Sequence, residues 1–245
     1  MIVCLASIEN SIISTDVIER VPYVLSSYYY LKSNFYMINK IKVPQVFMLD
    51  SGAFSFMNSI DKKVDFDKYL DEYADFINKY DIDLFFELDV DSVMGYEKVK
   101  EYRKILETKT NKRCIPVWHK SRGINDFIET CKTYDYIAIG GIVTKEITQT
   151  EYKYFPKLIE IAHKNGCKVH GLGFTSMKYL NNIKFDSVDS SSWNAAGRYG
   201  IVYQYKNGKI YGLRKDNYRI VDCKSTDVWN IKEWIKFQKY AYYWL

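Results

Sequence analysis

The chain has 245 residues, a net charge of +5 at neutral pH, and 47% hydrophobic and 27% charged residues. This length can bury a substantial core and fits one α/β domain better than two separate domains, and the composition is ordinary for a soluble protein. The modest positive charge permits nucleic-acid binding without requiring it.

The apolar runs and the cysteines indicate the cellular compartment. The first apolar run, Ile2 to Ala6, is long enough only for a strand, and no stretch has the length of a transmembrane span or the flanks of a signal peptide. The cysteines are odd in number and form no Cys-x-x-Cys pair, which predicts free thiols in a reducing compartment. They are Cys4, Cys114, Cys131, Cys167 and Cys223. We therefore expect a cytoplasmic protein with no membrane partner.

In chain order, short strand-like segments alternate with helix-like segments. The predicted strands are Ile2 to Ala6, Val46 to Leu49, Leu84 to Leu88, Ile115 to Trp118, Tyr136 to Ile139, Lys168 to Leu172, and one that ends at Asp189. Apolar residues at a spacing of three and four predict the helices, which are Phe66 to Tyr80, Tyr96 to Glu107, Ile124 to Cys131, Tyr152 to Lys164 and Met177 to Leu180. This alternation predicts βαβ units and a parallel sheet. We expect a TIM-like (β/α)8 barrel, although seven strands are one short of a closed eight.

The remaining segments predict a further helix and a C-terminal extension. Tyr28 to Leu31 is interpreted as a helix packed on the barrel wall. Gly200 to Tyr205 is a candidate for the eighth strand, but Asn207-Gly208 favours a type I′ turn that pairs it with Lys209 to Leu213 in a hairpin. Val228 to Leu245 predicts an amphipathic closing helix. We expect one domain, with the barrel in residues 1–195 and the hairpin and helix in residues 196–245.

Acids, histidines and glycines follow the predicted strands, where the active site of a parallel barrel lies. They are Asp50, Asp89 with Asp91, His119, Gly140-Gly141, His170-Gly171-Leu172-Gly173 and Asp189. Each alone has another explanation: an aspartate caps a helix, a histidine is structural, a glycine pair makes a tight turn, and the Asp89/Asp91 pair binds a metal. Their recurrence at the same end of successive strands favours a shared site.

Two carboxylates at one site can divide labour between a nucleophile and a proton carrier when their environments separate their pKa values. Glycosyl transfer through a covalent intermediate has this requirement. A retaining glycosidase has it too, although the glycine pair and Phe54 favour a flat base over a sugar.

Four segments resemble motifs of the tRNA-guanine transglycosylases, in the order of that family. Asp50-Ser51-Gly52-Ala53-Phe54 resembles Asp-Ser-Gly-Gly-Phe or Tyr, and Tyr136 to Ile142 resembles a segment that contains Ile-Gly-Gly-Leu. His170-Gly171-Leu172-Gly173 is similar to Met-Gly-Val-Gly, and Asp186-Ser187-Val188-Asp189 keeps the Asp-x-x-Asp spacing around the nucleophile.

The resemblance implies a role for each matching residue. Asp189 is the implied nucleophile that attacks C1′ of the nucleoside, and Asp50 is the implied general acid and base. The implied substrate contacts are Phe54 stacked on the base, Asp89 (or Asp91) accepting from its N–H groups, His119 (or Trp118) bonding its carbonyl, and Gly140 and Gly141 presenting backbone groups to the substituent on its five-membered ring. His170 and Gly173 are further candidates for substrate binding.

The chain departs from the family after the nucleophile. It lacks the Cys-x-Cys-x-x-Cys zinc motif there, because only Cys223 follows Asp189, and Ser190 to Asn194 replaces a Pro-Thr-Arg segment, with Arg198 later. Short relatives that install 7-deazaguanines in DNA, several of them carried by bacteriophages, match better. We therefore expect exchange of guanine in DNA, in a flipped or single-stranded nucleotide, for a free 7-deazaguanine base. The alternatives are the same exchange on tRNA and a non-catalytic barrel that binds a modified base or nucleotide.

Cofactor and nucleic-acid contacts complete the prediction. No metal or other cofactor is expected, because the three histidines show no ligand spacing such as His-x-x-x-His. The candidate DNA-binding residues are Arg198, Lys206, Lys209, Arg214 and Lys215. A solvated hairpin edge kept soluble by lysines explains most of them equally well.

Overall fold

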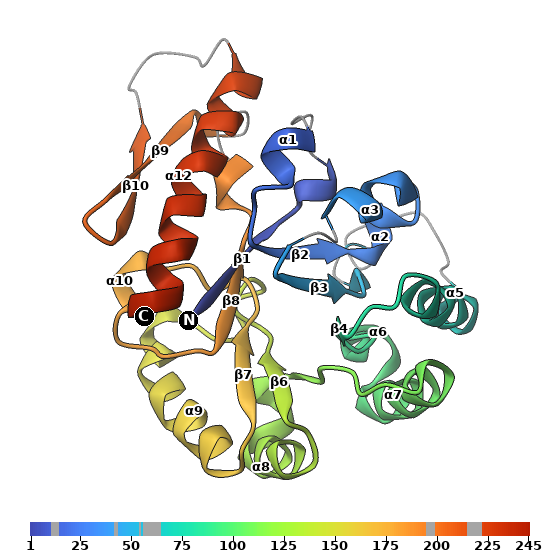
Figure 1. Cartoon of the computed structure of the whole chain (residues 1–245). Helices are drawn as coiled ribbons and strands as arrows, with labels where there is room; N and C mark the ends of the chain where they lie inside the picture. The colour runs from blue at the N-terminus through green and yellow to red at the C-terminus, as the bar shows by residue number, and fades with distance from the viewer. Residues whose placement is uncertain (11–14, 42–43, 54, 56–64, 195–198, 215–221) are drawn as a thin grey trace.

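A parallel eight-stranded sheet forms the centre of the molecule (Figure 1). The computed structural model describes residues 1–10, 15–41, 44–53, 55, 65–194, 199–214 and 222–245. The strands of the sheet are β1 (Ile2–Ala6), β2 (Tyr23–Ser27), β3 (Val46–Asp50), β4 (Leu84–Phe85), β5 (Val117–Trp118), β6 (Tyr136–Ile139), β7 (Lys168–Gly171) and β8 (Ser187–Ser190). Their order is β4-β3-β2-β1-β8-β7-β6-β5, and every neighbouring pair is parallel.

The sheet curls until its two edges meet. Ile115 N–H donates to Phe85 O at 2.8 Å, and Glu87 N–H donates to Ile115 O at 3.0 Å. This parallel bridge joins the chain beside β4 to the chain beside β5. The architecture is therefore a curled α/β sheet flanked by helices, consistent with a TIM-like barrel.

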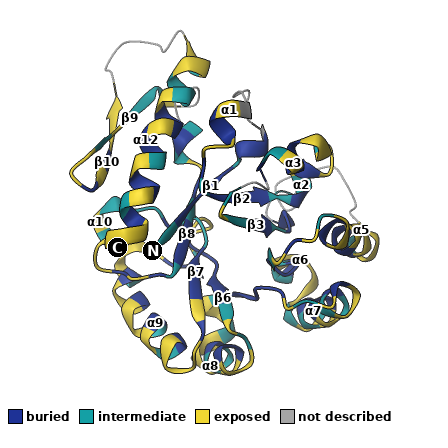
Figure 2. Ribbon diagram, viewed as in Figure 1, coloured by how far each residue is buried: buried dark blue, intermediate teal, exposed yellow. Residues whose placement is uncertain are grey.

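Alternation along the strands builds two hydrophobic cores, since successive side chains of a strand point to opposite faces. One set fills the inside of the curl, and it includes Cys4, Ala6, Tyr23, Leu25, Met48, Phe86, Ile115, Val117 and Ala138. The other set, which includes Val3, Leu5, Val24, Leu49, Ile137 and Val188, packs against the surrounding helices. Figure 2 shows this layering as buried strands inside helices whose outer faces are exposed.

The helices cover the outside of the sheet, and the predicted long helices are all present. The α-helices are α1 (Thr15–Ile18), α2 (Tyr28–Leu31), α3 (Ile38–Ile41), α5 (Phe66–Lys79), α6 (Asp91–Met94), α7 (Tyr96–Thr110), α8 (Gly123–Thr133), α9 (Phe155–Lys164), α10 (Met177–Leu180) and α12 (Cys223–Trp244). Short 3-10 helices are η1 (Ile8–Asn10), η2 (Phe35–Met37), η3 (Lys120–Arg122), η4 (Gln149–Tyr154) and η5 (Ser192–Asn194). The predicted helix at Tyr28 is confirmed as α2, with Tyr28 and Leu31 buried.

The eighth strand is β2, which the sequence prediction missed. It runs directly into α2, with Ser27 as the helix N-cap, so no turn residue separates the strand from the helix. Gly200 to Tyr205, the candidate for this strand, belongs instead to a separate hairpin of β9 (Ile201–Lys206) and β10 (Lys209–Arg214). The predicted type I′ turn is borne out by positive φ angles of 50° at Asn207 and 75° at Gly208.

Strands β4 and β5 are shorter than predicted. The sequence predicts strands as far as Leu88 and from Ile115, but the regular ladder covers two residues in each strand. A buried side chain causes the break, because Val117 N–H donates to the Glu87 carboxylate at 2.7 Å and not to a neighbouring carbonyl.

Helix α12 closes the structure and carries three buried polar residues that bond to the rest of the fold, one of which, Glu233, accepts from Tyr205 N–H at 2.7 Å. Gln238, which interrupts the predicted apolar face, donates to Val3 O at 2.7 Å and to Tyr23 O at 2.8 Å. Asn230 donates to Trp193 O and Ile201 O, so α12 is fixed both to the sheet and to the hairpin. Their hydrogen bonds explain why these positions are polar.

Two further features are the character of the helices and the state of the cysteines. Within the described ranges, no helix combines the length and apolar character needed to cross a membrane. All five cysteines are free thiols, as predicted, and four of them are buried.

Candidate active site

Asp189 lies near the carboxyl end of β8, and its side chain is 13% exposed. Its Oδ1 accepts hydrogen bonds from Gly173 N–H at 2.6 Å and from His170 Nε2 at 3.3 Å. Asp186, the other acid of the Asp-x-x-Asp spacing, lies at the opposite end of the strand, where it accepts from Val169 N–H and contacts His163, both at 2.8 Å. Only Asp189 is therefore at the end of the sheet where the chemistry is expected.

Asp50 is the last residue of β3, and its Oδ2 accepts from Gly52 N–H at 2.9 Å. Gly52 has a φ of +81°, and a Cβ there would lie 2.5 Å from Tyr29 Cβ, so this turn requires glycine. Burial raises the pKa of Asp50 to about 7, and the Asp189, Asp89 and Glu9 carboxylates add to this rise against the opposing Gly52 hydrogen bond. Asp50 therefore exchanges a proton near neutral pH, as a general acid and base must.

Glu9 is a buried acid of the same region that the sequence prediction missed. It lies in η1, directly after β1, and is 4% exposed. Its Oε1 accepts from Ser27 N–H at 3.1 Å, and burial raises its pKa. Its position just beyond a strand is the same signal that identifies Asp50 and Asp89 in the sequence.

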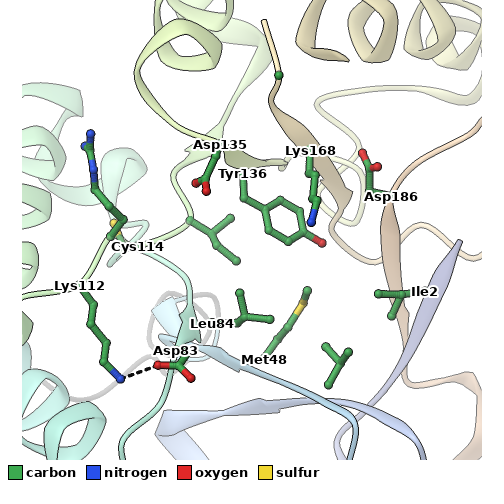
Figure 3. Close-up of a pocket in the computed structure, with 14 residues that line it drawn as sticks. Ile2, Met48, Asp83, Leu84, Lys112, Cys114, Asp135, Tyr136, Lys168 and Asp186 are labelled. Carbon is green, nitrogen blue, oxygen red and sulfur yellow. Dashed lines mark hydrogen bonds and ion pairs between the residues drawn. The ribbon is translucent and has the colours of Figure 1, made fainter.

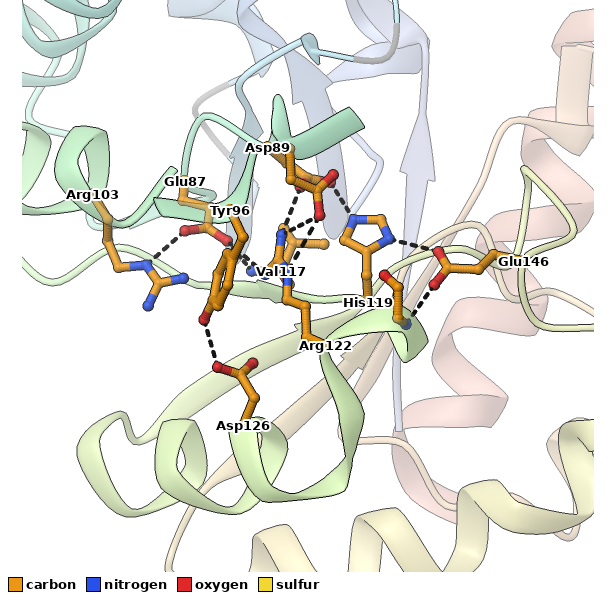
Figure 4. Close-up of polar contacts among 11 residues, drawn as sticks. Glu87, Asp89, Tyr96, Arg103, Val117, His119, Arg122, Asp126 and Glu146 are labelled. Carbon is orange, nitrogen blue, oxygen red and sulfur yellow. Dashed lines mark hydrogen bonds and ion pairs between the residues drawn. The ribbon is translucent and has the colours of Figure 1, made fainter. Parts of the chain in front are cut away.

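A second cluster centres on His119, which lies between two carboxylates (Figure 4). His119 Nε2 is 2.8 Å from Asp89 Oδ2, and Nδ1 is 2.9 Å from Glu146 Oε2. Burial lowers the pKa of His119, but the bonds to Asp89 and Glu146 outweigh burial and raise the pKa to about 9. At neutral pH both ring nitrogens therefore carry a proton and donate.

Arg122 supplies a second buried cation to this cluster. Its guanidinium lies 2.8 Å from Asp91 Oδ2, 3.4 Å from Asp89 Oδ1 and 4.0 Å from the Tyr96 ring centre, with 4% of the side chain exposed. A neighbouring buried pair, Arg103 and Glu87 at 2.6 Å, lies beside it (Figure 4), with Glu87 Oε1 3.8 Å from the Arg122 guanidinium. His119 and Arg122 thus face three carboxylates, those of Asp89, Asp91 and Glu146.

The same residues form a candidate metal-ligand set. Among the described residues, Asp89, Asp91 and His119 each offer a ligand atom within 4.8 Å of the others. A metal ligand must be a deprotonated imidazole, whereas the pKa of His119 is raised to about 9. A divalent ion would also have to displace the Arg122 guanidinium. The donor set therefore fits a hydrogen-bonded ion-pair network better than a metal centre.

The glycine pair after β6 allows this network to pack. A Cβ on Gly140 would lie 2.8 Å from Val117 Cγ1 and 2.9 Å from His119 Cε1. Gly141 has a φ of +78°, and a Cβ there would lie 2.8 Å from Glu146 Oε2. Both positions therefore need glycine for the His119 contacts, and their predicted contact with a substrate stays a prediction.

The structure also places the alternatives for base recognition. Trp118 is buried, donates from Nε1 to Gly123 O at 3.1 Å and packs on Phe127 of α8, so it points away from the cluster. His119, and not Trp118, joins Asp89 in the network. Asp91 begins α6 and contacts Arg122.

The candidate DNA-binding residues are spread along the hairpin. Lys206 and Lys209 flank the turn, where Gly208 packs against Tyr240 near the end of α12. Arg214 is at the other end of the hairpin, and its Nε donates to Tyr199 O at 3.2 Å. Six-residue strands separate the two ends by about 17 Å, so these residues do not form one compact patch. Phe54, Arg198 and Lys215 lie outside the described residues.

No family model matches the chain, and no curated protein matches its sequence. The functional proposal therefore depends on the chemistry of the site and on the motif resemblance.

The position of His119 predicts a measurable pKa change. Replacing Glu146 with glutamine removes one of the carboxylates that raise the pKa of His119, so this pKa is expected to fall by about 1. NMR titration of the three histidines measures it, with His119→Gln for assignment. Glu151→Gln is the matched control, because Glu151 bonds Lys120 and Thr148 and not His119. An unchanged pKa in Glu146→Gln would contradict the network.

The sign of the linked stability follows from the same pKa. The folded-state pKa of His119 is raised from 6.5 to about 9, so the folded state binds this proton more tightly than the unfolded state does. Its contribution to stability is complete below about pH 6.5 and is lost as the pH rises through about 9.

Proposed function

We propose that the protein exchanges guanine in DNA for a free 7-deazaguanine base through a covalent bond between Asp189 and the deoxyribose. The observation that carries the proposal is the contrast between two neighbouring acids. Asp50 has a pKa raised to about 7, in part by Asp189, whereas Asp189 has one carboxylate oxygen held by two donors. One acid is suited to move a proton and the other to attack, which is the division of labour that the resemblance to the transglycosylases implies.

The proposed reaction has two balanced steps. In the first, an Asp189 oxygen bonds to C1′ while the bond between C1′ and guanine N9 breaks; the electron pair goes to N9, and protonated Asp50 supplies the proton that releases neutral guanine. In the second step Asp50, now a carboxylate, takes the proton from the pyrrole nitrogen of the incoming deazaguanine. That nitrogen bonds to C1′ and displaces Asp189.

The His119 cluster is the proposed base-recognition surface. Its distances place Asp89, His119 and the glycine pair together. A carboxylate oxygen accepts more than one hydrogen bond, so Asp89 can retain His119 while it accepts from the N–H groups of a guanine-like base. His119 donates both of its N–H groups to carboxylates, so it bonds the base carbonyl by exchanging one of these partners for the substrate.

The C-terminal region after the nucleophile favours DNA over tRNA as the polymer that carries the base. A zinc-bearing C-terminal region is typical of the tRNA enzymes, and this chain has one cysteine after Asp189. The described residues after β8 form η5, the β9/β10 hairpin and α12. DNA is therefore the proposed substrate and tRNA the alternative.

Mass spectrometry of nucleosides tests the proposal. DNA and tRNA are incubated separately with the protein and candidate 7-deazaguanine bases, then digested to nucleosides. The expected product is a deazaguanine deoxynucleoside from DNA. A modified nucleoside from tRNA alone would replace the DNA proposal by its alternative. Modification of neither polymer, with the free base still bound in calorimetry, would leave a binding barrel and overturn the enzyme assignment.

A further inference from the structure

A chain of buried hydrogen bonds leads from Asp189 into the interior of the sheet. His170 Nε2 is 3.3 Å from Asp189 Oδ1, His170 Nδ1 is 2.5 Å from Ser187 Oγ, and Ser187 Oγ is 2.5 Å from the Tyr136 hydroxyl. His170 and Ser187 have no exposed surface and are paired neighbours on β7 and β8. This series of hydrogen bonds therefore crosses three adjacent strands, β6, β7 and β8.

The Tyr136 end of this series of hydrogen bonds lies at the opposite end of the sheet from Asp189. Tyr136 is the first residue of β6 and lines a cavity of about 810 Å³ at the amino ends of the strands (Figure 3). Asp186 and Ile2 line the same cavity. Asp189, in contrast, lies near the carboxyl end of β8, so the hydrogen-bonded chain connects the two ends of the sheet.

The donors of this chain can be assigned from Asp189 inward. A carboxylate only accepts, so His170 Nε2 carries the proton that it shares with Asp189. His170 Nδ1 then accepts from the Ser187 hydroxyl, and the Ser187 oxygen accepts from the Tyr136 hydroxyl. Each hydroxyl donates once and every hydrogen bond is satisfied in one direction, which selects a single tautomer of His170.

The effect on Asp189 is that its two carboxylate oxygens differ. Oδ1 accepts from both Gly173 and His170. Among the described residues no hydrogen bond reaches Oδ2. The structure thus holds one oxygen and leaves the other available to bond to carbon.

We propose that His170, Ser187 and Tyr136 are positioning residues that fix the Nε2–H tautomer of His170 and thereby orient Asp189 with Oδ2 as the attacking oxygen. The kinetic part of this inference rests on the proposed base exchange, whereas the tautomer of His170 does not. In this arrangement His170, predicted from the sequence as a substrate contact, acts through Asp189. Gly173, a second such residue, acts through its backbone N–H.

The first test measures the tautomer by ¹⁵N–¹H NMR of histidine-labelled protein at pH 8. Wild-type protein is expected to show His170 protonated at Nε2 alone. Ser187→Ala removes the donor to Nδ1, so the Nδ1 signal is expected to shift while the Asp189 carboxylate keeps the proton on Nε2. A His170 signal protonated at Nδ1 in wild-type protein, or one unchanged in Ser187→Ala, would overturn the proposal.

The second test separates kcat from KM in the base-exchange assay. Ser187→Ala is expected to lower kcat by about tenfold to a hundredfold, and Tyr136→Phe by less, with KM for DNA unchanged. His170→Gln keeps a donor near the Nε2 position and is expected to retain more activity than His170→Leu. Tyr134→Phe is the matched control, because the Tyr134 hydroxyl bonds Glu107 and none of the residues from Asp189 to Tyr136.

The two tests fail separately. A rise in KM with kcat unchanged in Ser187→Ala would make these residues substrate contacts and would overturn their positioning role. Should wild-type protein modify neither DNA nor tRNA, the proposed function fails. The NMR result still decides whether these hydrogen bonds fix the tautomer of His170. Tyr136→Phe removes one oxygen only, so a folded variant is available if Ser187→Ala does not fold.

Discussion

Asp189→Asn is expected to lower kcat of base exchange by about 10⁴-fold or more, since it removes the nucleophile of the proposed reaction. Asparagine has the same shape, and its amide oxygen can still accept from Gly173 N–H and His170 Nε2. The fold should therefore persist while the side chain can no longer form the bond to C1′. Nucleoside mass spectrometry measures the rate. Denaturing gel electrophoresis of protein with labelled DNA, without incoming base, measures the covalent adduct, which is expected in wild-type protein and absent in the variant.

Asp186→Asn is the matched control for this substitution. Asp186 has the same chemistry and lies three residues away, but its carboxylate contacts Val169 N–H and His163 at the amino end of β8. The variant is expected to lose about 1 kcal/mol of stability and to keep its kcat. Adduct formation by Asp189→Asn, or its loss in Asp186→Asn alone, would exclude Asp189 as the nucleophile.

The sequence allowed prediction of those site residues whose position is set by the end of a strand. Asp50, Asp89, His119 and Asp189 follow or end separate predicted strands. Parallel strands place their carboxyl ends at one edge, so the residues directly after each strand already approximate the site. This prediction of residue positions required only that the strands be found. Missing β2 did not affect it, because no predicted site residue lies on that strand.

Glu9 was missed although it follows β1, whereas the other residues missed by sequence reasoning are those whose position depends on side-chain reach. Arg122 contacts Asp91, 31 residues away, and Glu146 contacts His119, 27 residues away. Neither residue follows a strand directly, and no local pattern encodes a contact that depends on loop conformation and rotamer. The same applies to Ser187, whose role within the Asp-x-x-Asp segment becomes visible only when β7 and β8 set it beside His170.

The predicted boundaries of β4 and β5 were wrong for a related reason. The sequence predicts β4 and β5 from apolar content, which correctly locates the buried segment. A side chain, the Glu87 carboxylate, takes the backbone N–H of Val117 and ends the ladder early. An acid within an apolar run is the available signal, but its partner lies in another strand.

Asp50→Asn is expected to lower kcat by about 10²- to 10⁴-fold and to stabilise the protein at alkaline pH. The activity falls because asparagine can neither give a proton to the leaving guanine nor take one from the incoming base. Its side-chain oxygen can still accept from Gly52 N–H, which keeps the turn after β3. Stability should rise because the half-buried carboxylate is ionised at pH 8, where partial burial and the neighbouring acids oppose its charge.

The pH dependence of this gain has a definite sign. The pKa of Asp50 is raised from 3.8 to about 7 on folding, so the folded state binds the proton more tightly than the unfolded state, and wild-type stability falls as the pH rises through this interval. Asparagine does not titrate, so the variant is expected to exceed wild type by a few kcal/mol at pH 8 and to lose this advantage toward pH 4, since one pKa unit corresponds to about 1.4 kcal/mol. Urea unfolding at both pH values measures the difference. Asp71→Asn, at an exposed site paired with Lys109, is the control and should show no such pH-dependent gain. Equal stability of Asp50→Asn and wild type at pH 8 would show that Asp50 does not have the raised pKa that the proposed proton transfer requires.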